Sequence, residues 1–283
     1  MRPGAVALNA GLRRGWIEFR QTVTNAGQLV GWLFWPAVAL AVMYFMRDTT
    51  VAGTDFSLGT HAVPGILGIN TLFTGLVGLA FTLITDREDG TLLRAKATPN
   101  GILGYVTGKV LAQAATTVAV LLVLLVPVAF LFDGLRLGPV SSWATLVWVL
   151  VLGMLAILPV GAILGSLFRS TQGLVPIMVL IMVLVGFSGV FYPLAALPEW
   201  AQTLAQVFPV YWLGLGLRAA FLPDALAVSE IGESWRLWEM TGVLGVWGVV
   251  GCLVAPSVLR RTARRESGSA VAARRESVAR RTE

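Results

Sequence analysis

Charged side chains of both signs gather between residues 85 and 99, in the sequence TDREDGTLLRAKATP. Carboxylates and guanidinium groups make charge-assisted hydrogen bonds, which are stronger than neutral ones. The stretch lies between two apolar runs, 62–84 and 108–132, each long enough to cross a bilayer as a helix of about 20 residues. It is therefore predicted to be a short loop at one face of a membrane. Its mixed charge favours a docking surface for another protein; the alternative is a solvated loop that only joins two helices.

The sequence patterns of common catalytic and nucleotide-binding sites do not occur in the chain. There is no P-loop for ATP phosphates, no nucleophile elbow and no His-Glu-x-x-His zinc helix. The single cysteine, Cys252, and the single histidine, His61, cannot form a disulfide framework or a histidine cluster. The apolar runs also lack the intramembrane acids that ion-coupled carriers use. We therefore expect no enzyme activity, cofactor or metal on this chain, and an energy source outside it.

The composition is that of an integral membrane protein. Of 283 residues, 56% are hydrophobic and 13% are charged, whereas soluble domains average about 25% charged residues. Six apolar runs predict an all-α membrane protein with six transmembrane helices and no soluble domain. The runs cover residues 28–46, 62–84, 108–132, 143–168, 173–192 and 237–259.

The positions of the basic residues predict the orientation. Of the 21 lysines and arginines, 17 fall in the N-terminal segment, around the loop after the second run, between the fourth and fifth runs, or in the tail. The positive-inside rule places these segments in the cytoplasm. Both termini are then cytoplasmic, and the chain is a multi-pass protein of the cell membrane. The net charge of +6 thus favours contacts with anionic lipid headgroups, and we expect no nucleic-acid partner.

The two ends of the chain differ from the membrane domain, residues 28–259. In residues 1–27, Leu8, Leu12 and Trp16 recur at helical spacing, followed by Phe19 and Val23. This predicts an amphipathic helix that lies flat in the inner headgroup layer; the alternative is a disordered leader. Residues 260–283 are rich in Arg, Ala and Ser without an apolar period, which predicts a disordered basic tail.

The segment between the fifth and sixth runs is too apolar for an ordinary loop. Prolines bracket apolar residues at helical spacing, which predicts a short helix that dips into the outer leaflet and returns. The alternative is an amphipathic helix on the outer surface. As a re-entrant segment it would form an outer gate, for which the candidate residues are Pro198, Trp200, Phe208 and Pro209.

A few mild polar residues interrupt the second and third runs. They can line a substrate path or hydrogen-bond between packed helices. The candidates for the path are Asn70, Thr74, Gln113 and Thr117. In the fourth run, Gly161 and Gly165 are spaced for close helix packing.

Two segments resemble the ABC-2 family of ABC transporter permeases. The family's cytoplasmic loop typically reads acid-Arg-Glu-x-Gly-Thr-Leu-x-Arg-Leu-x-Ala-Thr-Pro, and residues 86–99 match it except that Ala95 replaces a leucine. Residues 191–218 hold Phe-Tyr-Pro, Leu-Pro-Glu-Trp, Phe-Pro and Leu-Arg. This order resembles the segment between spans five and six of drug-exporting and lipid-exporting members, including permeases of the daunorubicin-resistance type. The resemblance covers nearly the whole chain.

The resemblance implies that the loop after span two couples the permease to a separate ATPase. The positions that carry this expected role are Asp86, Arg87, Glu88, Gly90, Thr91, Arg94 and Pro99. It also implies that the amphipathic helix is the connecting helix that precedes span one, and that the segment between spans five and six is re-entrant.

The expected function is that of the permease subunit of an ABC exporter for a hydrophobic or amphipathic cargo, such as a drug, a lipid or a polyketide-like metabolite. The partners would be two copies of an ATPase, which bind ATP and Mg, a second permease subunit, identical or paralogous, and membrane lipids. One alternative is a membrane-embedded enzyme acting on lipids. The other is a membrane partner of an ATPase that transports nothing.

Overall fold

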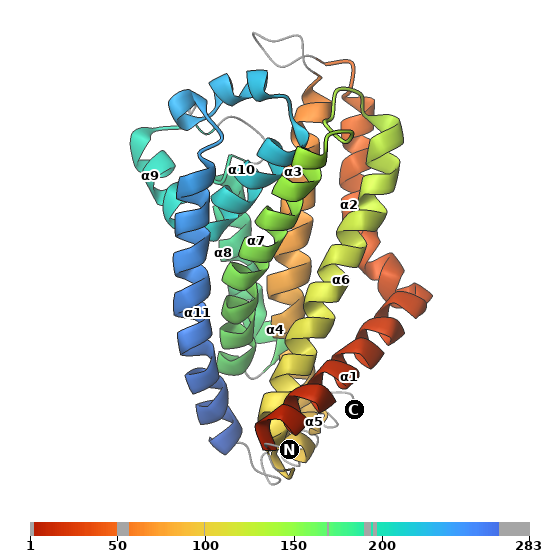
Figure 1. Ribbon diagram of the computed structural model, residues 1–283, viewed down its shortest axis with the longest axis vertical. Coiled ribbons are helices and arrows are strands. Elements are labelled where there is room, and N and C mark those ends of the chain that lie inside the picture. The colour runs from red at the N-terminus through yellow and green to blue at the C-terminus, as the bar shows by residue number, and fades with distance from the viewer. Residues whose placement is uncertain are drawn as a thin grey trace.

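The computed structural model of the chain describes residues 3–49, 57–98, 100–168, 170–189, 194 and 197–265. Within these residues, long helices run roughly side by side along the long axis of the molecule (Figure 1). The elements in chain order are α1 (Pro3–Thr24), α2 (Ala26–Phe45), α3 (Leu58–Leu72), the π-helical turn η1 (Phe73–Val77), α4 (Gly78–Glu88), α5 (Thr91–Lys96), α6 (Gly101–Leu131), α7 (Val140–Leu167), η2 (Thr171–Leu174), α8 (Val175–Gly186), α9 (Glu199–Val207), α10 (Pro209–Phe221), η4 (Asp224–Ser229), η5 (Ile231–Glu233) and α11 (Leu237–Arg265).

Within the described residues, five helical segments are long and apolar enough to cross a membrane. They are Ala26–Phe45, Gly59–Glu88, Gly101–Leu131, Val140–Leu167 and Leu237–Thr262. These segments correspond to five of the six predicted runs. The bent pair α9 and α10 would make a sixth if it counts as one span.

The predicted fifth run forms a shorter helix than expected. The apolar helical segment covers Thr171–Gly186, and its α-helical part, α8, has 12 residues. At 1.5 Å of rise per residue, α8 is about 18 Å long, whereas the hydrocarbon core is about 30 Å thick. The last residues of the run, 190–192, lie outside the described part.

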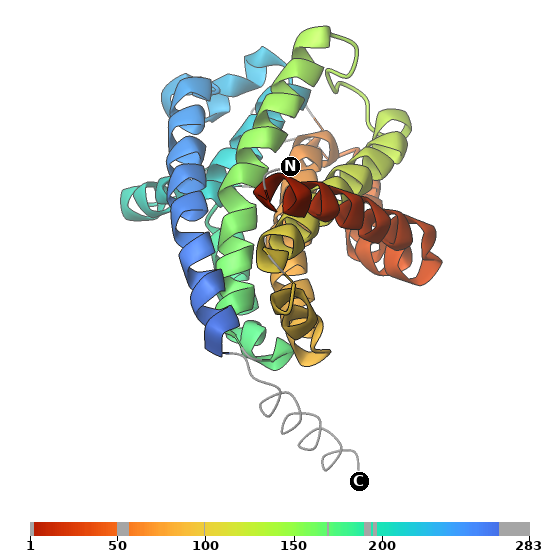
Figure 2. The ribbon, with the colours of Figure 1, turned by 60° about the horizontal axis from the view of Figure 1, so that its bottom comes forward.

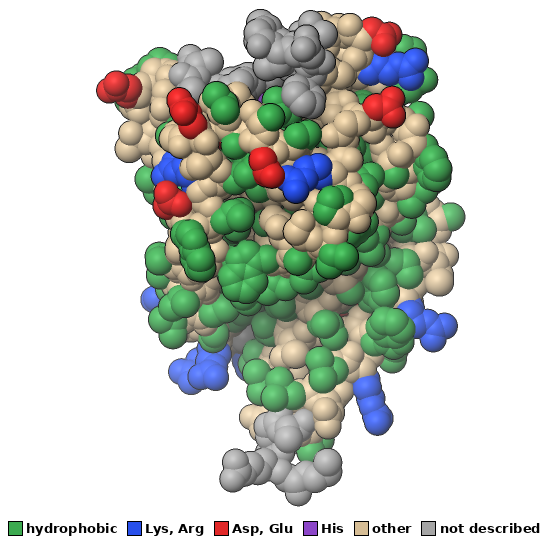
Figure 3. All heavy atoms as spheres, turned by 45° about the horizontal axis from the view of Figure 1, so that its top comes forward, with side chains coloured by type: hydrophobic (Ala, Val, Ile, Leu, Met, Phe, Trp, Pro, Cys, Tyr) green, Lys and Arg blue, Asp and Glu red, His purple; other side chains and the backbone are tan. Residues whose placement is uncertain are grey.

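The molecule has two ends that differ in what they hold (Figures 1 and 2). We call the end that holds the start of α1, the short helix α5 and the last residues of α11 the α5 end. The opposite end, which holds α9, η4 and η5, is called the α9 end. Figure 3 shows hydrophobic side chains in a broad band beside the charged rim of the α9 end. This band fits the acyl-chain region of a bilayer.

The segment formed by α3, η1 and α4 is the central span. Of its most apolar stretch of 18 residues, 78% is buried inside the protein, whereas the corresponding share for α2 is 6%. Glycines let α7 approach this segment closely: a Cβ on Gly161 would lie 2.5 Å from the Leu76 carbonyl oxygen, and one on Gly165 would lie 2.8 Å from that of Ala80. The predicted close-packing role of Gly161 and Gly165 is therefore confirmed.

Helix α1 packs across the first half of α6 through a second set of glycines (Figure 2). A Cβ on Gly11 would lie 2.6 Å from the Gly104 carbonyl oxygen, and one on Gly15 would lie 2.6 Å from that of Gly108. Leu8, Leu12 and Trp16 remain exposed on another side of α1. The predicted helix is thus present, while its placement in the headgroup layer stays a prediction.

Two long helices extend beyond the bounds of their predicted apolar runs. Helix α4 continues to Glu88, so Asp86 and Arg87 lie in its last turn, where each finds a partner on a neighbouring helix. Helix α11 continues to Arg265, beyond the predicted start of the tail at residue 260. A hydrogen bond from Thr262 Oγ1 to the Ser166 carbonyl, 3.3 Å, holds this extension against α7. Residues 266–283 lie outside the described part.

Candidate functional site

The candidate docking segment, residues 86–98, is a helix end, a tight turn and a short second helix. Gly90 separates α4 from α5 with φ 74°, in the left-handed region, which glycine adopts at little cost. The chain can therefore reverse within the two residues between these helices. Leu92 of α5 is buried and holds the short helix against the bundle. This segment lies at the α5 end (Figure 1).

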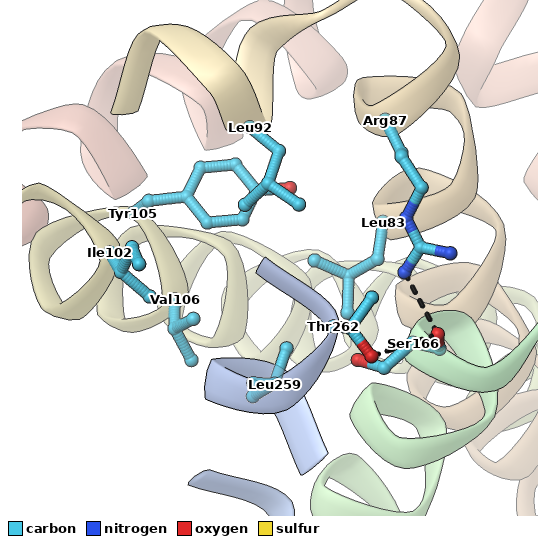
Figure 4. A pocket seen from close by; sticks show the side chains of 9 residues that line it. All are labelled: Leu83, Arg87, Leu92, Ile102, Tyr105, Val106, Ser166, Leu259 and Thr262. Atoms are coloured by element: carbon cyan, nitrogen blue, oxygen red, sulfur yellow. Dashed lines mark hydrogen bonds between the residues drawn. The ribbon is translucent and has the colours of Figure 1, made fainter. Parts of the chain in front are cut away.

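Arg87 points inward from this segment. Its side chain is 4% exposed, and its guanidinium donates to the carbonyls of Gly165 at 3.2 Å, Ser166 at 3.0 Å and Phe168 at 3.0 Å. These carbonyls end α7, where the last turn of a helix leaves acceptors unsatisfied and the helix dipole is negative. Arg87 is thus a cap on the C-terminus of another helix, and Figure 4 shows it directed there.

Asp86 is held by a second internal contact. Its Oδ2 lies 2.8 Å from Nζ of Lys109 on α6, and the same ammonium lies 3.0 Å from Oε2 of Glu18 on α1. The Lys109 side chain is 9% exposed, so little water competes for these bonds. Arg14 completes the cluster through a 2.9 Å bond to Glu18. One lysine therefore joins the end of α4 to both α6 and the N-terminal helix.

Gly90 is buried, and the other predicted residues of the segment are more accessible. Glu88 and Thr91 are half-buried and Arg94 is exposed. Nη2 of Arg94 donates to Thr91 Oγ1 at 2.9 Å, which orients the guanidinium along the outside of α5. Pro99 lies outside the described residues. The segment thus divides into inward residues, among them 86 and 87, and an accessible face formed by Arg94 with the half-buried Glu88 and Thr91.

A small cavity lies beneath α5 (Figure 4). Its volume of about 10 Å³ is close to the minimum that a single water needs, so it cannot hold a nucleotide or a cargo molecule. Its walls come from α4, α5, α6, α7 and α11. The lining residues are Leu83, Arg87, Leu92, Ile102, Tyr105, Val106, Ser166, Leu259 and Thr262.

The candidate outer-gate residues lie along a sharp bend at the α9 end. Helices α9 and α10 meet at 89°, with Pro209 buried at the start of α10. Phe208 at the bend lies against Trp247 of α11, with ring centroids 6.3 Å apart. Pro198 is exposed just before α9, and Trp200 is 64% exposed with its ring 6.0 Å from that of Phe187. The bend fits a re-entrant segment, while the gate role stays a prediction.

The candidate substrate-path residues are buried among packed helices. Thr74 is 1% exposed and Thr117 is 0% exposed, and Asn70 and Gln113 are also buried. Gln113 Nε2 donates at 2.6 Å to the carbonyl of Thr74, in the π-helical turn where the backbone departs from the α-helical pattern. This bond joins α6 to the central span, which favours the packing interpretation of these residues.

A buried ion pair at the α9 end escaped the sequence interpretation. Arg218 Nε lies 2.6 Å from Oε1 of Glu230, and both side chains are at most 2% exposed. Arg218 also donates to the Gly189 carbonyl at 3.1 Å. His61, the single histidine, is also buried. It lies in the first turns of α3, and α3 packs against α10.

The described residues hold no group of three or more His, Cys, Asp or Glu side chains that could bind a metal ion. The contacts of Lys109 and Glu18 with the candidate docking segment were not predicted from the sequence. The available signal was Lys109 itself, the second residue of the apolar run 108–132, because a charge so placed needs a partner. The inward role of Arg87 has no such local signal, since its acceptors are backbone carbonyls about 80 residues away.

Comparisons with known proteins agree with this architecture. A family model described as "ABC-2 family transporter protein" matches residues 35–255, which include the five apolar helices except for parts of the first and last. No curated protein is similar enough in sequence to be matched to the chain. The match covers more than half of the chain, so the protein belongs to the ABC-2 transporter family and is a membrane permease component of an ABC transporter, whose family partner is an ATPase subunit.

Proposed function

We propose that the chain is the permease subunit of an ABC exporter and that its ATPase docks on the accessible face of residues 86–98. The observation that carries the proposal is the contrast within this segment. Asp86 and Arg87 are fixed to neighbouring helices, while Arg94 is exposed and Glu88 is half-buried. A partner bound to such a face can displace the helices behind it, whereas a flexible loop would absorb the movement.

The cargo is hydrophobic or amphipathic and passes between two permease chains. The candidate polar residues of spans two and three are buried within one chain, where Gln113 hydrogen-bonds to the backbone of the central span. Helices α2 and α11 carry broad exposed apolar faces, because only 6% and 22% of their most apolar stretches are buried. These faces suit contact with lipid tails, with a lipid-like cargo and with a second chain, identical or paralogous. Two ATPase subunits bind ATP and Mg at the cytoplasmic side.

Co-purification tests this proposal most simply. The chain is isolated from its native membrane with a mild detergent, and bound proteins are identified by mass spectrometry. We expect an ATPase with Walker motifs. Reconstituted with it, the permease should make ATP hydrolysis respond to a panel of lipids and lipophilic drugs. Glu88→Ala and Arg94→Ala should remove that response, whereas Arg274→Ala and Arg275→Ala should not. Recovery of an ATPase whose hydrolysis responds to none of these compounds would favour the alternative that the chain is a membrane partner of an ATPase and transports nothing.

The orientation has its own test in intact cells. In a Cys252→Ser background, a cysteine at Asp224, which is exposed at the α9 end, should react with a membrane-impermeant thiol reagent. A cysteine at Thr98, exposed at the α5 end, should react only after the cells are opened. Labelling of Thr98→Cys from outside would reverse the topology.

A further inference from the structure

We propose that Arg87 is a positioning residue that carries movement of the docking segment to α7, and that it makes no contact with the ATPase. This inference rests on the proposed function. It separates Arg87 from Glu88 and Arg94, its neighbours in the same sequence pattern. Those two belong to the accessible face, whereas Arg87 belongs to the interior of the permease.

The hydrogen bonds of Arg87 are directional and specific. Nη1 donates to the Phe168 carbonyl, and Nη2 donates to those of Gly165 and Ser166. A planar guanidinium presents donors in a fixed fork, so it fixes orientation as well as distance. The acceptors form the C-terminal turn of α7, which attracts a cation. At 4% exposure, Arg87 is also withdrawn from any partner that approaches α5 from outside.

The contact continues into a third helix. Thr262 Oγ1 of α11 donates to the same Ser166 carbonyl, at 3.3 Å, that receives Arg87 (Figure 4). One residue before Ser166, Gly165 lies so close to α4 that a Cβ on it would lie 2.8 Å from the Ala80 carbonyl oxygen. Helix α4 therefore packs directly against α7 at this point, and Arg87 holds the last turn of α4 to the end of α7. A push on the end of α4 moves α7, and through Ser166 it also reaches α11.

The preceding residue makes the opposite connection. Asp86 binds Lys109, which also binds Glu18, so residue 86 joins α4 to α6 and α1. Successive residues of a helix point about 100° apart, and residues 86 and 87 use this to hold the last turn of α4 from two sides. The branch through Arg87 is the one that reaches α7 and α11.

The test compares three variants of the full chain in complex with the ATPase that purifies with it. Arg87→Gln removes the charge and the fork, Arg87→Lys keeps the charge alone, and Arg94→Gln removes the exposed guanidinium. Arg260→Gln, at an exposed arginine near the same end of α11, is the control. The first readout is the amount of ATPase retained. The second is the reactivity of a cysteine at exposed Leu167, at the end of α7, with and without ATP plus Mg, in a Cys252→Ser background.

We expect Arg87→Gln to retain the ATPase but to abolish the nucleotide-dependent change at Leu167→Cys. Arg87→Lys should restore part of that change, and Arg94→Gln should lose the ATPase itself. The inference is overturned if Arg87→Gln loses as much ATPase as Arg94→Gln, or if the nucleotide still alters the reactivity at residue 167 as in the wild type.

A third readout needs no ATPase. Spin labels on Ala97→Cys, at the end of α5, and Leu167→Cys report the distance between the docking segment and α7 in lipid nanodiscs. Their distance distribution should broaden in Arg87→Gln and narrow again in Arg87→Lys. An unchanged distance distribution in Arg87→Gln would contradict the proposal that Arg87 fixes the docking segment to α7. If no ATPase purifies with the wild-type chain, the proposed function fails, and this readout still decides whether Arg87 fixes α5 to α7.

Discussion

The α5 end and the α9 end both bury charged side chains, but they connect different parts of the chain. At the α5 end, Lys109 joins α1, α4 and α6, and Arg87 joins α4 to α7. At the α9 end, Arg218 and Glu230 are only 12 residues apart, and they fix α10 to the turns that follow it. The first arrangement connects helices that are far apart in the sequence, while the ion pair of the second lies within one short stretch, from which Arg218 also reaches the Gly189 carbonyl.

This difference bears on how each end works. Charges that bridge separate helices transmit displacement, because moving one helix breaks bonds unless the others follow. A charge pair within one local unit keeps the shape of that unit. We therefore expect the α9 end to respond to loss of its pair mainly in stability, and the α5 end mainly in coupling.

The largest loss of stability should come from Glu230→Ala. It leaves Arg218 buried without its carboxylate, and breaking a buried pair in this way costs about 3–5 kcal/mol. Thermal unfolding of the purified permease in detergent measures this loss. The matched control is Asp224→Ala in the Arg136–Asp224 pair, whose side chains are 31% and 73% exposed and whose expected effect is below about 1 kcal/mol. Equal losses of stability in the two variants would show that the buried ion pair contributes no more to stability than the surface pair.

Lys109→Met should have an intermediate effect. It leaves the carboxylates of Asp86 and Glu18 without their shared cation, and an unsatisfied buried group costs about 1–3 kcal/mol. Both carboxylates are partly accessible, at 15% and 22%, so water offsets some of this loss. Limited proteolysis should then cut between α1 and α2 faster than in the wild type. Lys96→Met, at an exposed lysine of α5, is the control, and equal cleavage of the two variants would show that Lys109 does not hold α1.

Arg94→Ala should have the smallest effect on stability. Its side chain is exposed on α5, and surface substitutions away from packed features usually change stability little. The unfolding temperature should stay that of the wild type, while ATPase binding is lost. A drop in unfolding temperature comparable to that of Lys109→Met would mean that Arg94 serves the fold, and that the accessible face has been wrongly assigned.

The sequence predicted the apolar helices well because about 20 consecutive apolar residues are a strong signal. It placed five of the long helices, the amphipathic pattern of α1, and the glycine contact at Gly161 and Gly165. It marked residues 86–99 as a candidate docking segment through a family pattern, yet treated them as one surface. Which of these residues point inward depends on α7 and α6, and no local pattern in residues 86–99 contains that information.

The fifth run shows a second limit of sequence reasoning. Hydropathy alone cannot separate a full span from a short helix followed by a bend, because both are equally apolar. The structure ends α8 at Gly186 and turns the chain again at Pro209, where α9 and α10 meet at 89°. The pair of Arg218 and Glu230 was missed for a similar reason. An arginine in an apolar segment signals a partner, but the identity of that partner depends on the fold.

The claim that the ATPase docks on α5 is tested most directly by site-specific photo-crosslinking in native membranes. A photoreactive amino acid replaces exposed Arg94 on α5 in one variant, and Val228, 67% exposed at the α9 end, in the other. Mass spectrometry then identifies the crosslinked proteins. We predict an adduct with an ATPase that carries Walker motifs from position 94 and none from position 228. An ATPase adduct from position 228, or none from position 94 in a complex that still contains the ATPase, would contradict the docking site.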